Sequence, residues 1–420
     1  MQANQHKNRY KDLPFFTSKN YRFERFSMAD INQRLKEHLA YAIANAPAVK
    51  SIFDSAGLTL KDVQTVADLQ KLPVTSKDQF TEMQQANPPF GGWLAVPIER
   101  LQRIHLSPGP IFDPFGVDDT ELFEDAELAL SRAGFGKGDI VVNTFLYHMV
   151  PAGLLLDEGL RRTGAVVVPM GPGNTETQIK VILDLKIVGY VGTPSFLSMI
   201  LDKMVEMGIP KTAIPLKKAF FSAEPYPPSL RAKFEGEYGL QTSQAYATAD
   251  LGVVAYEVYG EQGFILPNNL IVELVDPQTG QWVQEGTPGE VVVTSFSKTY
   301  PLLRFGTGDM AVMIPGAGRL FGLVGRSGEA VKVRGMFLHP NQLRFATASF
   351  AGIAGLQAVV TRDGDYDQVT LKVVPQTGAS VDGEALKAAI KQVAHLSINA
   401  VEFVDAIEGQ RLIMDERTWD

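Results

Sequence analysis

The chain has 420 residues, 45% of them hydrophobic and 20% charged, which is typical of a globular protein with two or more domains. Its formal net charge of −8 argues against nucleic acid or a membrane surface as the main partner, because both select a basic face. The absence of cysteine excludes disulfides, thiolate metal sites and a cysteine nucleophile. No apolar run is long enough to span a bilayer, so we expect a soluble, cytoplasmic protein.

The N-terminal part is expected to be helical over residues 28–56. Ile31, Leu35 and Leu39 recur at helical spacing, and Asp30 suits the first turn of such a helix. The following segment "LQKLPVTSKDQF" predicts a loop that leads into another helix, with Ser76 as its N-cap.

Residues 120–250 alternate between apolar strands, such as "AVVVPM", and amphipathic helices, such as "NTETQIKVILDLK". This alternation predicts a parallel sheet that is covered by helices on both faces. Ligands bind such sheets at the carboxyl ends of the strands. The candidate ligand-binding loops are therefore residues 147–149, 170–174, 193–195, 222–226 and 246–250.

The pattern changes after residue 250. Residues 263–324 predict a small β-rich subdomain, in which "LIVELVDPQTGQWVQEGTPGEVVVTSF" reads as a hairpin. Residues 326–420 have a βαββαβ-like order and the length of a small independent domain. We therefore expect an α/β protein with a large N-terminal domain, residues 1–325, and a small α+β domain, residues 326–420. The large domain would hold mixed, mainly parallel sheets.

Two motifs at strand ends are candidates for ligand binding. The loop "SAEPYPP" follows a strand, and its backbone could line a flat ring, or it could be a plain strand-to-helix turn whose prolines start the helix. In "AYATAD", Tyr246, Thr248 and Asp250 share one side of an extended segment. They could stack on a ring, contact a phosphate and bind Mg²⁺, respectively. The alternative is a strand end with a capping aspartate.

Two further motifs lie closer to the C-terminus. In "LLRFGTGDM", Asp309 follows a glycine turn and could accept hydrogen bonds from a ribose diol, or it could be an ordinary β-turn aspartate. In "VGRSGEAVKVRG", Arg326, Lys332 and Arg334 concentrate positive charge that suits a ribose or phosphate. The alternative for this segment is a strand edge protected by charge.

His148 lies in the predicted loop "LYHMVPAG" and could line a pocket or orient a carboxylate. A structural hydrogen-bonding role is the alternative for a single histidine on a loop. No serine, histidine and aspartate order typical of a catalytic triad is evident.

Together the motifs resemble those of the phenylacetate-CoA ligase branch of the AMP-forming adenylating superfamily, which includes acyl-CoA synthetases, luciferases and adenylation domains. The resemblance covers nearly the whole chain, and it is carried by the segments "KLPVTSKDQF", "GPGNTETQI", "GTPSF", "SAEPY", "YATAD", "VDPQTG", "GEVVVTSF", "PLLRFGTGDM" and "GRSGEAVKVRGMFLHPNQL". It implies a small C-terminal domain that rotates against the large one, with the site between them. It also implies that a carboxylic acid reacts with Mg-ATP to give an acyl-adenylate, which a thiol, usually CoA, then attacks.

The resemblance assigns roles to individual residues. Around the adenine and the ribose it implies Ala223, Glu224, Pro225, Tyr246, Asp309 and Arg326. At the phosphates and Mg²⁺ it implies Ser107, Gly109, Thr248 and Asp250, and on the CoA side Lys332 and Arg334. For the acyl or aryl pocket it implies Tyr147, His148, Phe221 and Ala245.

Two lysines of the family pattern are replaced in this chain. The family's phosphate loop ends in Gly-Lys-Pro, and Asp113 stands at the lysine position. Near the C-terminus a catalytic lysine is expected where the chain has Gln410, with Arg411 next to it. Arginine could still bind an α-phosphate oxygen, with a planar fork in place of an ammonium.

Three functions remain open on the sequence alone. The first is AMP-forming activation of a carboxylic acid, the aryl class being favoured, with transfer to CoA. The second is an acyl-transfer half-reaction from a supplied adenylate or thioester. The third is a non-catalytic binder of a nucleotide or an aromatic acid. The oligomeric state also stays open, with a homodimer as one option.

Overall fold

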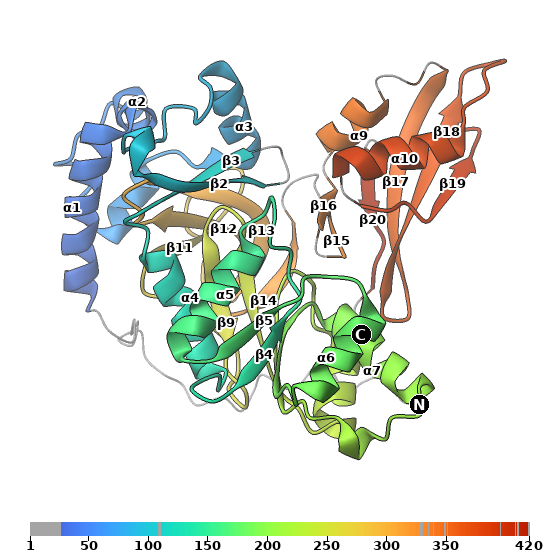
Figure 1. Ribbon diagram of the computed structural model, residues 1–420. Helices are drawn as coiled ribbons and strands as arrows, with labels where there is room; N and C mark the ends of the chain where they lie inside the picture. The colour runs from blue at the N-terminus through green and yellow to red at the C-terminus, as the bar shows by residue number, and fades with distance from the viewer. Residues whose placement is uncertain are drawn as a thin grey trace, which may run out of the picture.

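The computed structural model describes residues 27–107, 111–326, 331–334, 336–338, 340–347, 350, 352–394, 396–407, 409 and 411–418. Within these ranges no helix is long and apolar enough to cross a membrane. We call residues 27–326 the large lobe and residues 331–418 the small lobe. Figure 1 shows the small lobe beside the carboxyl-edge loops of the large one.

The N-terminal segment forms two helices where the sequence predicted one. Helix α1 (Met28–Asn45) begins with Ser27, whose side chain and that of Asp30 form a reciprocal capping box. Helix α2 (Pro47–Ala56) follows after Ala46. Pro47 has no N–H to continue the α1 ladder, but it is well suited to the first position of a new helix. Helix α3 (Lys77–Ala86) has Ser76 as its N-cap, as predicted.

The large lobe is organised around one mixed twelve-stranded sheet with the order β11-β12-β13-β14-β10-β9-β8-β7-β6-β4-β5, with β1 (Thr75–Ser76) paired to β13. In one half, five neighbouring strands pair in parallel, and β8, the last of them, pairs antiparallel with β9 and so joins this half to the rest. These strands are β4 (Ile140–Asn143), β5 (Val166–Pro169), β6 (Gly189–Gly192), β7 (Lys218–Phe221) and β8 (Gln241–Thr248). The predicted parallel sheet is thereby confirmed.

Helices cover both faces of the parallel half. Helices α4 (Glu121–Arg132) and α5 (Ala152–Thr163) pack on one face, and α6 (Thr175–Asp184) and α7 (Pro194–Glu206) on the other. Helix α8 (Pro228–Arg231) runs into a π-helical turn (Ala232–Glu237) on the α7 side. Gly164 ends α5 in the left-handed conformation, as the sequence pattern indicated.

The other half of the sheet is antiparallel. Its strands are β9 (Gly252–Glu257), β10 (Phe264–Ile265), β11 (Leu270–Val275), β12 (Pro288–Ser295), β13 (Phe305–Ile314) and β14 (Arg319–Arg326). The predicted hairpin is formed by β11 and β12. These strands continue the same sheet, and helices α1 and α2 pack against their core. A separate hairpin of β2 (Leu101–Ser107) and β3 (Ile111–Gly116) lies next to α3.

The small lobe has its own sheet and its own apolar core. The sheet order is β19-β18-β17-β20, with helices α9 and α10 packed together beside it. The elements are β15 (Val331–Val333), β16 (Met336–Leu338), α9 (Pro340–Thr347), β17 (Ile353–Asp363), β18 (Tyr366–Pro375), α10 (Gly383–Ala394), β19 (Ala400–Phe403) and β20 (Ile413–Asp415). The β17–β18 hairpin extends toward the large lobe (Figure 1).

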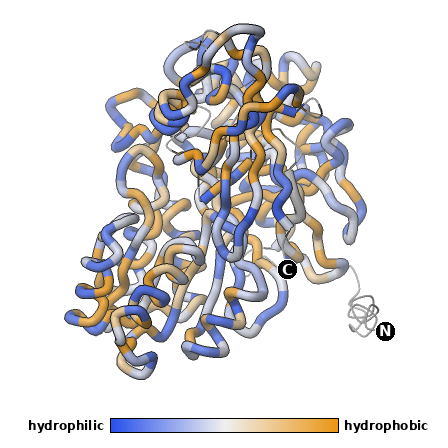
Figure 2. Tube along the Cα trace, turned by 90° about the vertical axis from the view of Figure 1, so that its right-hand side faces the viewer, coloured by the Kyte–Doolittle hydropathy of each residue, from blue (hydrophilic) through white to orange (hydrophobic). Residues whose placement is uncertain are grey.

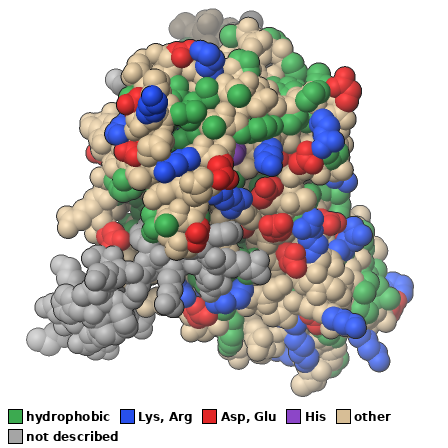
Figure 3. All heavy atoms as spheres, turned by 90° about the vertical axis from the view of Figure 1, so that its left-hand side faces the viewer, with side chains coloured by type: hydrophobic (Ala, Val, Ile, Leu, Met, Phe, Trp, Pro, Cys, Tyr) green, Lys and Arg blue, Asp and Glu red, His purple; other side chains and the backbone are tan. Residues whose placement is uncertain are grey.

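The distribution of side chains agrees with this architecture. Figure 2 shows apolar stretches along the strands and helices of both lobes, interrupted by hydrophilic turns. On the face shown in Figure 3, Lys and Arg side chains are interspersed with Asp and Glu side chains. This face therefore has no broad surface of one charge that would favour a polyanionic partner.

Candidate functional site

A cavity of about 1000 Å³ lies between the two lobes at the carboxyl edge of the parallel strands. All five predicted ligand-binding loops, the last of which is the end of β8, contribute to its wall, as do β2, α3, α5 and the small lobe. Its principal lining residues are Thr81, Gln85, Ser107, Thr144, Phe145, His148, Met149, Pro172, Thr193, Ser195, Met199, Phe220, Ser222, Ala223, Glu224, Ala245, Thr248, Val253, Lys332, Arg334, Gln342, Arg362 and Tyr366. The rule that ligand sites lie at strand ends in α/β sheets thus predicted its place.

Backbone strain gathers at this cavity. Six described residues other than glycine have a positive φ, and three of them, Met149, Ala223 and Arg334, line the cavity. A left-handed backbone costs a residue with a Cβ about 1–2 kcal/mol. Such strain is retained mainly where the position of a loop matters for binding or catalysis. The strained residues therefore support this cavity as the functional site.

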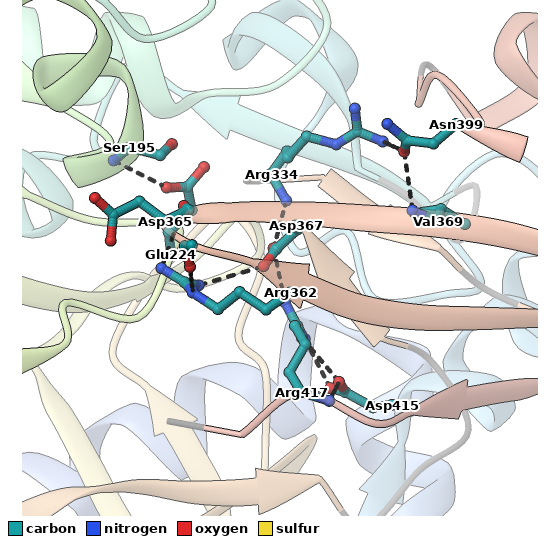
Figure 4. A network of polar contacts seen from close by, with 11 residues as sticks. Ser195, Glu224, Arg334, Arg362, Asp365, Asp367, Val369, Asn399, Asp415 and Arg417 are labelled. Carbon is teal, nitrogen blue, oxygen red and sulfur yellow. Dashed lines mark hydrogen bonds and ion pairs between the residues drawn. The ribbon is translucent and has the colours of Figure 1, made fainter. Parts of the chain in front are cut away.

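The loop after β7 holds the predicted adenine-binding residues Ala223 and Glu224 at the cavity wall. The hydroxyl of Ser222 donates to the carbonyl of Ala245 at 2.9 Å and ties this loop to β8. The Glu224 carboxylate accepts from the backbone N–H of Ser195 at 3.3 Å (Figure 4). Burial between the lobes raises the pKa of Glu224, and the charge of Arg362 opposes that rise. Pro225 is exposed and is not among the described residues that line the cavity.

Tyr246 and Asp309 form a buried pair and are not among the described residues that line the cavity. The Tyr246 hydroxyl donates to Asp309 Oδ2 at 2.9 Å, and both residues are almost fully buried. Asp309 lies on β13, opposite Arg326 of β14, so the "FGTGDM" and "VGRSGEA" motifs meet as neighbours in the sheet. The side chain of Arg326 lies outside the described part of the structure. The aromatic ring of Tyr246 and the carboxylate of Asp309 are thus held together.

Thr248 and Asp250 separate at the end of β8. Thr248 lines the cavity, whereas Asp250 follows in a turn and pairs with Lys77 of α3 at 3.0 Å. The strand carries a bulge between Tyr246 and Ala247, which changes the alternation of side chains. The sequence pattern predicted that the three side chains share one side of the strand. Because of the bulge and the turn, they do not share one wall of the cavity.

Asp113 lies on β3 close to Asp250. Its side chain is buried, and both carboxylate oxygens lack a hydrogen-bond partner among the described residues. Burial and the negative charge of Asp250 raise the pKa of Asp113 well above its usual value, while Lys77 acts in the opposite direction. Ser107 lines the cavity, and its hydroxyl donates to Asp250 at 3.4 Å. Gly109 of the same loop lies outside the described residues.

The apolar end of the cavity lies between β4, α5 and β8. Its wall includes Phe145, Leu155, Phe220, Ala245 and Val253, with His148 at the rim, so two of the predicted pocket residues are in place. Side chains of this kind form a compartment for an apolar or aromatic group.

The other two predicted pocket residues lie elsewhere. Phe221 is fully buried on the opposite face of the sheet, against Tyr226 and Phe234, because neighbouring residues of a strand point to opposite faces. The adjacent Phe220 takes its place in the cavity wall. The Tyr147 hydroxyl donates to Asp157 of α5 at 2.8 Å, which anchors the loop, and Tyr147 is not among the described lining residues.

The small lobe closes the cavity with cations. Lys332 and Arg334 line the wall, as the motif "VKVRG" predicted, and they are joined by Arg362 from β17. Asp367 accepts from Arg362 Nη1 at 3.3 Å and from Arg417 Nη1 at 2.7 Å, next to the turn of the β17–β18 hairpin (Figure 4). Cations gathered in this way suit phosphate groups.

Two candidate site residues were not identified from the sequence, and one predicted residue does not line the cavity. Arg362 and Lys77 carried no role in the sequence analysis, although Lys77 belongs to the recognised motif "KLPVTSKDQF". Arg411 is exposed, its carbonyl accepts from Gln357, and it is not among the described residues that line the cavity. Gln410 lies outside the described residues.

Similar proteins were found by sequence and by structure, although no family model matches the chain. The phenylacetate-coenzyme A ligase of Aromatoleum evansii is 30% identical over 380 residues, which cover 86% of this chain and 85% of that one. The Escherichia coli K12 phenylacetate-coenzyme A ligase is 30% identical over 357 residues, 81% of this chain and 80% of that one.

Solved structures of a 2-hydroxyisobutyryl-CoA ligase share the fold at 22% identity. The structure of its complex with 2-HIB-AMP and CoA in the thioesterification state matches with a TM-score of 0.84. The alignment covers 92% of this chain and 89% of that one. The structure in the postadenylation state with 2-HIB-AMP matches with a TM-score of 0.68. That alignment covers 93% of this chain and 89% of the other. The mixed α/β fold expected from the sequence is thus confirmed. From the sequence identity to its relatives and its coverage of their length, the chain belongs to the phenylacetate-CoA ligase family.

Proposed function

We propose that the protein activates a monocarboxylic acid with an aryl or otherwise apolar body as an acyl-adenylate and passes the acyl group to CoA. One observation carries this proposal: a single cavity has an apolar end, a wall from the "SAEPY" and "YATAD" loops, and a cationic wall from the small lobe. The phenylacetate-coenzyme A ligases among the relatives support the reaction class and the aryl preference.

The acid would occupy the apolar end, with its carboxylate toward Thr248. No Lys or Arg of the large lobe is among the described lining residues, so a second carboxylate on the substrate would lack a partner there. His148 lies at the rim, where it could orient the carboxylate. This charge pattern favours a monocarboxylic acid over a dicarboxylic acid.

The nucleoside would lie along the loop after β7, with Ala223 and Glu224 beside the adenine. Tyr246 would support the adenine, and Asp309 would accept from the ribose hydroxyls, as carboxylates do in other nucleotide folds. The hydrogen bond between Tyr246 and Asp309 holds both groups in place before the ligand arrives. Such preorganisation lowers the ordering cost of binding.

Mg²⁺ is the cation that accompanies ATP, and Asp250 is the carboxylate that the resemblance assigns to it, although it is not among the described residues that line the cavity. Oxygen ligands of this kind fit Mg²⁺, although the Asp250 carboxylate is paired with Lys77 in this structure. When bound, Mg²⁺ would neutralise phosphate charge. The residues Ser107 and Thr248 would contribute hydroxyl groups to the phosphates.

The small lobe would serve the second half-reaction. Lys332, Arg334 and Arg362 line the cavity together with Asp365 and Asp367, and the cations among them suit the phosphates of CoA. We further propose that the domains are residues 1–325 and 326–420, and that the small one rotates between the two steps. Gly325 precedes a segment outside the described residues that contains Gly328, and glycines suit a hinge.

Acid-dependent exchange of labelled pyrophosphate into ATP tests the first step. We expect exchange with arylacetic acids, and much less with dicarboxylic acids of similar length. Addition of CoA should then give the acyl thioester, detected by mass spectrometry.

Absence of exchange across a broad panel of aryl and fatty acids would overturn the proposal. If an acyl-adenylate then still formed the thioester, the acyl-transfer half-reaction would be the function. If AMP only raised the melting temperature without turnover, the protein would be a binder. These alternatives are worth testing because Asp113 replaces the lysine of the family's phosphate loop, so a positive charge is missing there.

A further inference from the structure

The triphosphate end of the site lacks the cation that the family places in its phosphate loop. Asp113 stands at that position, is buried, and has carboxylate oxygens without a hydrogen-bond partner among the described residues. The described lining residues that carry positive charge, Lys332, Arg334 and Arg362, all come from the small lobe. A triphosphate at the large-lobe end therefore needs another cation.

Lys77 is placed to supply this charge. Its Nζ lies 3.0 Å from Asp250 Oδ2, across 173 positions of sequence. The Lys77 side chain is 23% exposed, whereas that of Asp250 is 3% exposed, so Lys77 is the more accessible member of the pair. Lys77 begins α3, and Thr81 and Gln85 of the same helix line the cavity.

The surroundings of Lys77 combine one hydroxyl with two carboxylates, those of Asp250 and Asp113. The hydroxyl of Ser107, which lines the cavity, donates to the same Asp250 carboxylate at 3.4 Å. Lys77, Asp250, Asp113 and Ser107 thus form one polar cluster, of which Ser107 is among the described residues that line the cavity. A lysine on a flexible stem can move by a few ångströms without a change in its helix.

We propose that Lys77 is the phosphate-binding cation of this site and takes the role that the loop lysine has elsewhere in the family. Before nucleotide binds, Lys77 is held by Asp250. On binding, the ammonium moves to the β- and γ-phosphates, and the Asp250 carboxylate becomes available to the cation that accompanies ATP. This inference rests on the proposed function, since it names the group that recognises the triphosphate of ATP.

Direct binding to the full-length protein tests the role of Lys77 without turnover. Titration calorimetry would compare Mg-ATP, pyrophosphate and AMP for the wild type and for Lys77→Met, which keeps the length of the side chain and removes its charge. We expect Lys77→Met to weaken Mg-ATP and pyrophosphate about ten- to a hundredfold, as loss of a charge-assisted hydrogen bond does. AMP should bind within about twofold of the wild type, because it lacks the β- and γ-phosphates.

Two further variants distinguish phosphate binding by Lys77 from a role in which Lys77 only supports the fold. Lys77→Arg keeps the charge and should retain most of the Mg-ATP affinity. Lys71→Met removes another lysine that is paired with an aspartate, Asp68, outside the cavity, and should change no ligand affinity. Equal weakening of AMP and Mg-ATP by Lys77→Met would show that Lys77 only supports the fold, and would overturn the inference. Unchanged Mg-ATP affinity would overturn it as well.

The binding result is separable from the proposed reaction. If the wild type binds Mg-ATP through Lys77 but gives no pyrophosphate exchange with any acid, the proposed function fails and the assignment of Lys77 stands. If exchange occurs and Lys77→Met leaves both exchange and Mg-ATP affinity unchanged, the proposed function stands and the assignment of Lys77 fails.

Discussion

At the scale of single residues, buried charges show how this chain satisfies polar groups away from water. Arg304 and Glu273 are both about 1% exposed and form an ion pair at 3.1 Å, and Arg304 also donates to the carbonyl of Gly280. Asp125 of α4 is a different case. It is buried and accepts from the side chain of Asn269 at 3.0 Å, and burial raises its pKa to about 8.

The raised pKa of Asp125 predicts a stability that depends on pH. Between about pH 4 and pH 8 the folded state keeps a proton that the unfolded state releases, so stability should fall as the pH rises through this range. Asp125→Asn removes this titration. We expect the difference in unfolding free energy, Asp125→Asn minus wild type, to increase by up to about 4 kcal/mol as the pH is raised from about 5 to about 8. Urea unfolding at several pH values measures this difference.

The charged neighbours of Asp125 are Arg34, which favours the ionised carboxylate, and Glu124, which opposes it. The exposed Asp363→Asn is the control for loss of a carboxylate elsewhere. Parallel pH profiles for the wild type and Asp125→Asn would contradict the prediction.

At the scale of elements, the ends of the parallel strands hold the cavity wall together. The Thr144 hydroxyl after β4 donates to the Tyr190 hydroxyl of β6 at 3.1 Å, and Tyr190 donates to the carbonyl of Thr193 at 3.0 Å. Thr144 and Thr193 line the cavity. Gly192 lies against this chain of hydrogen bonds, where a Cβ would come 1.9 Å from Thr144 Oγ1. The end of β6 therefore requires glycine.

Gly192→Ala should destabilise the fold by about 1–3 kcal/mol, because the added methyl group overpacks the hydrogen-bonded hydroxyls. It should also weaken binding of AMP, since the loops that carry Thr144 and Thr193 would shift. Thermal unfolding and calorimetry measure the two effects.

Gly236→Ala is the matched control, because a Cβ at Gly236 would have no neighbour within 4 Å. It lies in the helical turn after α8, where alanine is favoured over glycine by about 0.5–1 kcal/mol. Equal stability of the two variants would show that the end of β6 relaxes without cost.

At the scale of the whole molecule, the site exists because the two lobes face each other. The large lobe supplies the apolar end and the nucleoside wall, and the small lobe supplies Lys332, Arg334 and Arg362. Asp367 receives hydrogen bonds from Arg362, Arg417 and the backbone of Arg334, so the hairpin and the "VKVRG" segment are fixed together (Figure 4). Lys332, Arg334 and Arg362 therefore line the cavity beside Asp367, and the Arg334 guanidinium is bonded to Ser397 and Asn399.

Lys332→Met tests the separation of the two half-reactions. Loss of its charge should raise the KM for CoA about tenfold, the effect of roughly 1.4 kcal/mol, while pyrophosphate exchange changes little. The comparison of thioester formation at varied CoA with exchange in the absence of CoA measures this split. Lys391→Met on the exposed face of α10 is the control. An equal loss in both assays would place Lys332 in the adenylation step.

Much of the fold could be predicted from local patterns. Periodicity and capping chemistry identified α3, α5, the alternating strands and the β11–β12 hairpin, because these depend on neighbours a few positions apart. The break between α1 and α2 was missed although Pro47 marked it, since the apolar repeat continues through it. All five predicted loops at the strand ends meet at the cavity, because parallel strands end on one edge.

The family, the element types and the edge of the sheet where the cavity lies could all be predicted from short motifs. Which side chains contact one another could be seen only in the tertiary structure. Phe220 rather than Phe221 lines the cavity, and both faces of that sheet are apolar, so no pattern could distinguish them. Lys77 meets Asp250 across 173 positions. Such a contact depends on how the helices and the sheet pack, which local sequence does not encode.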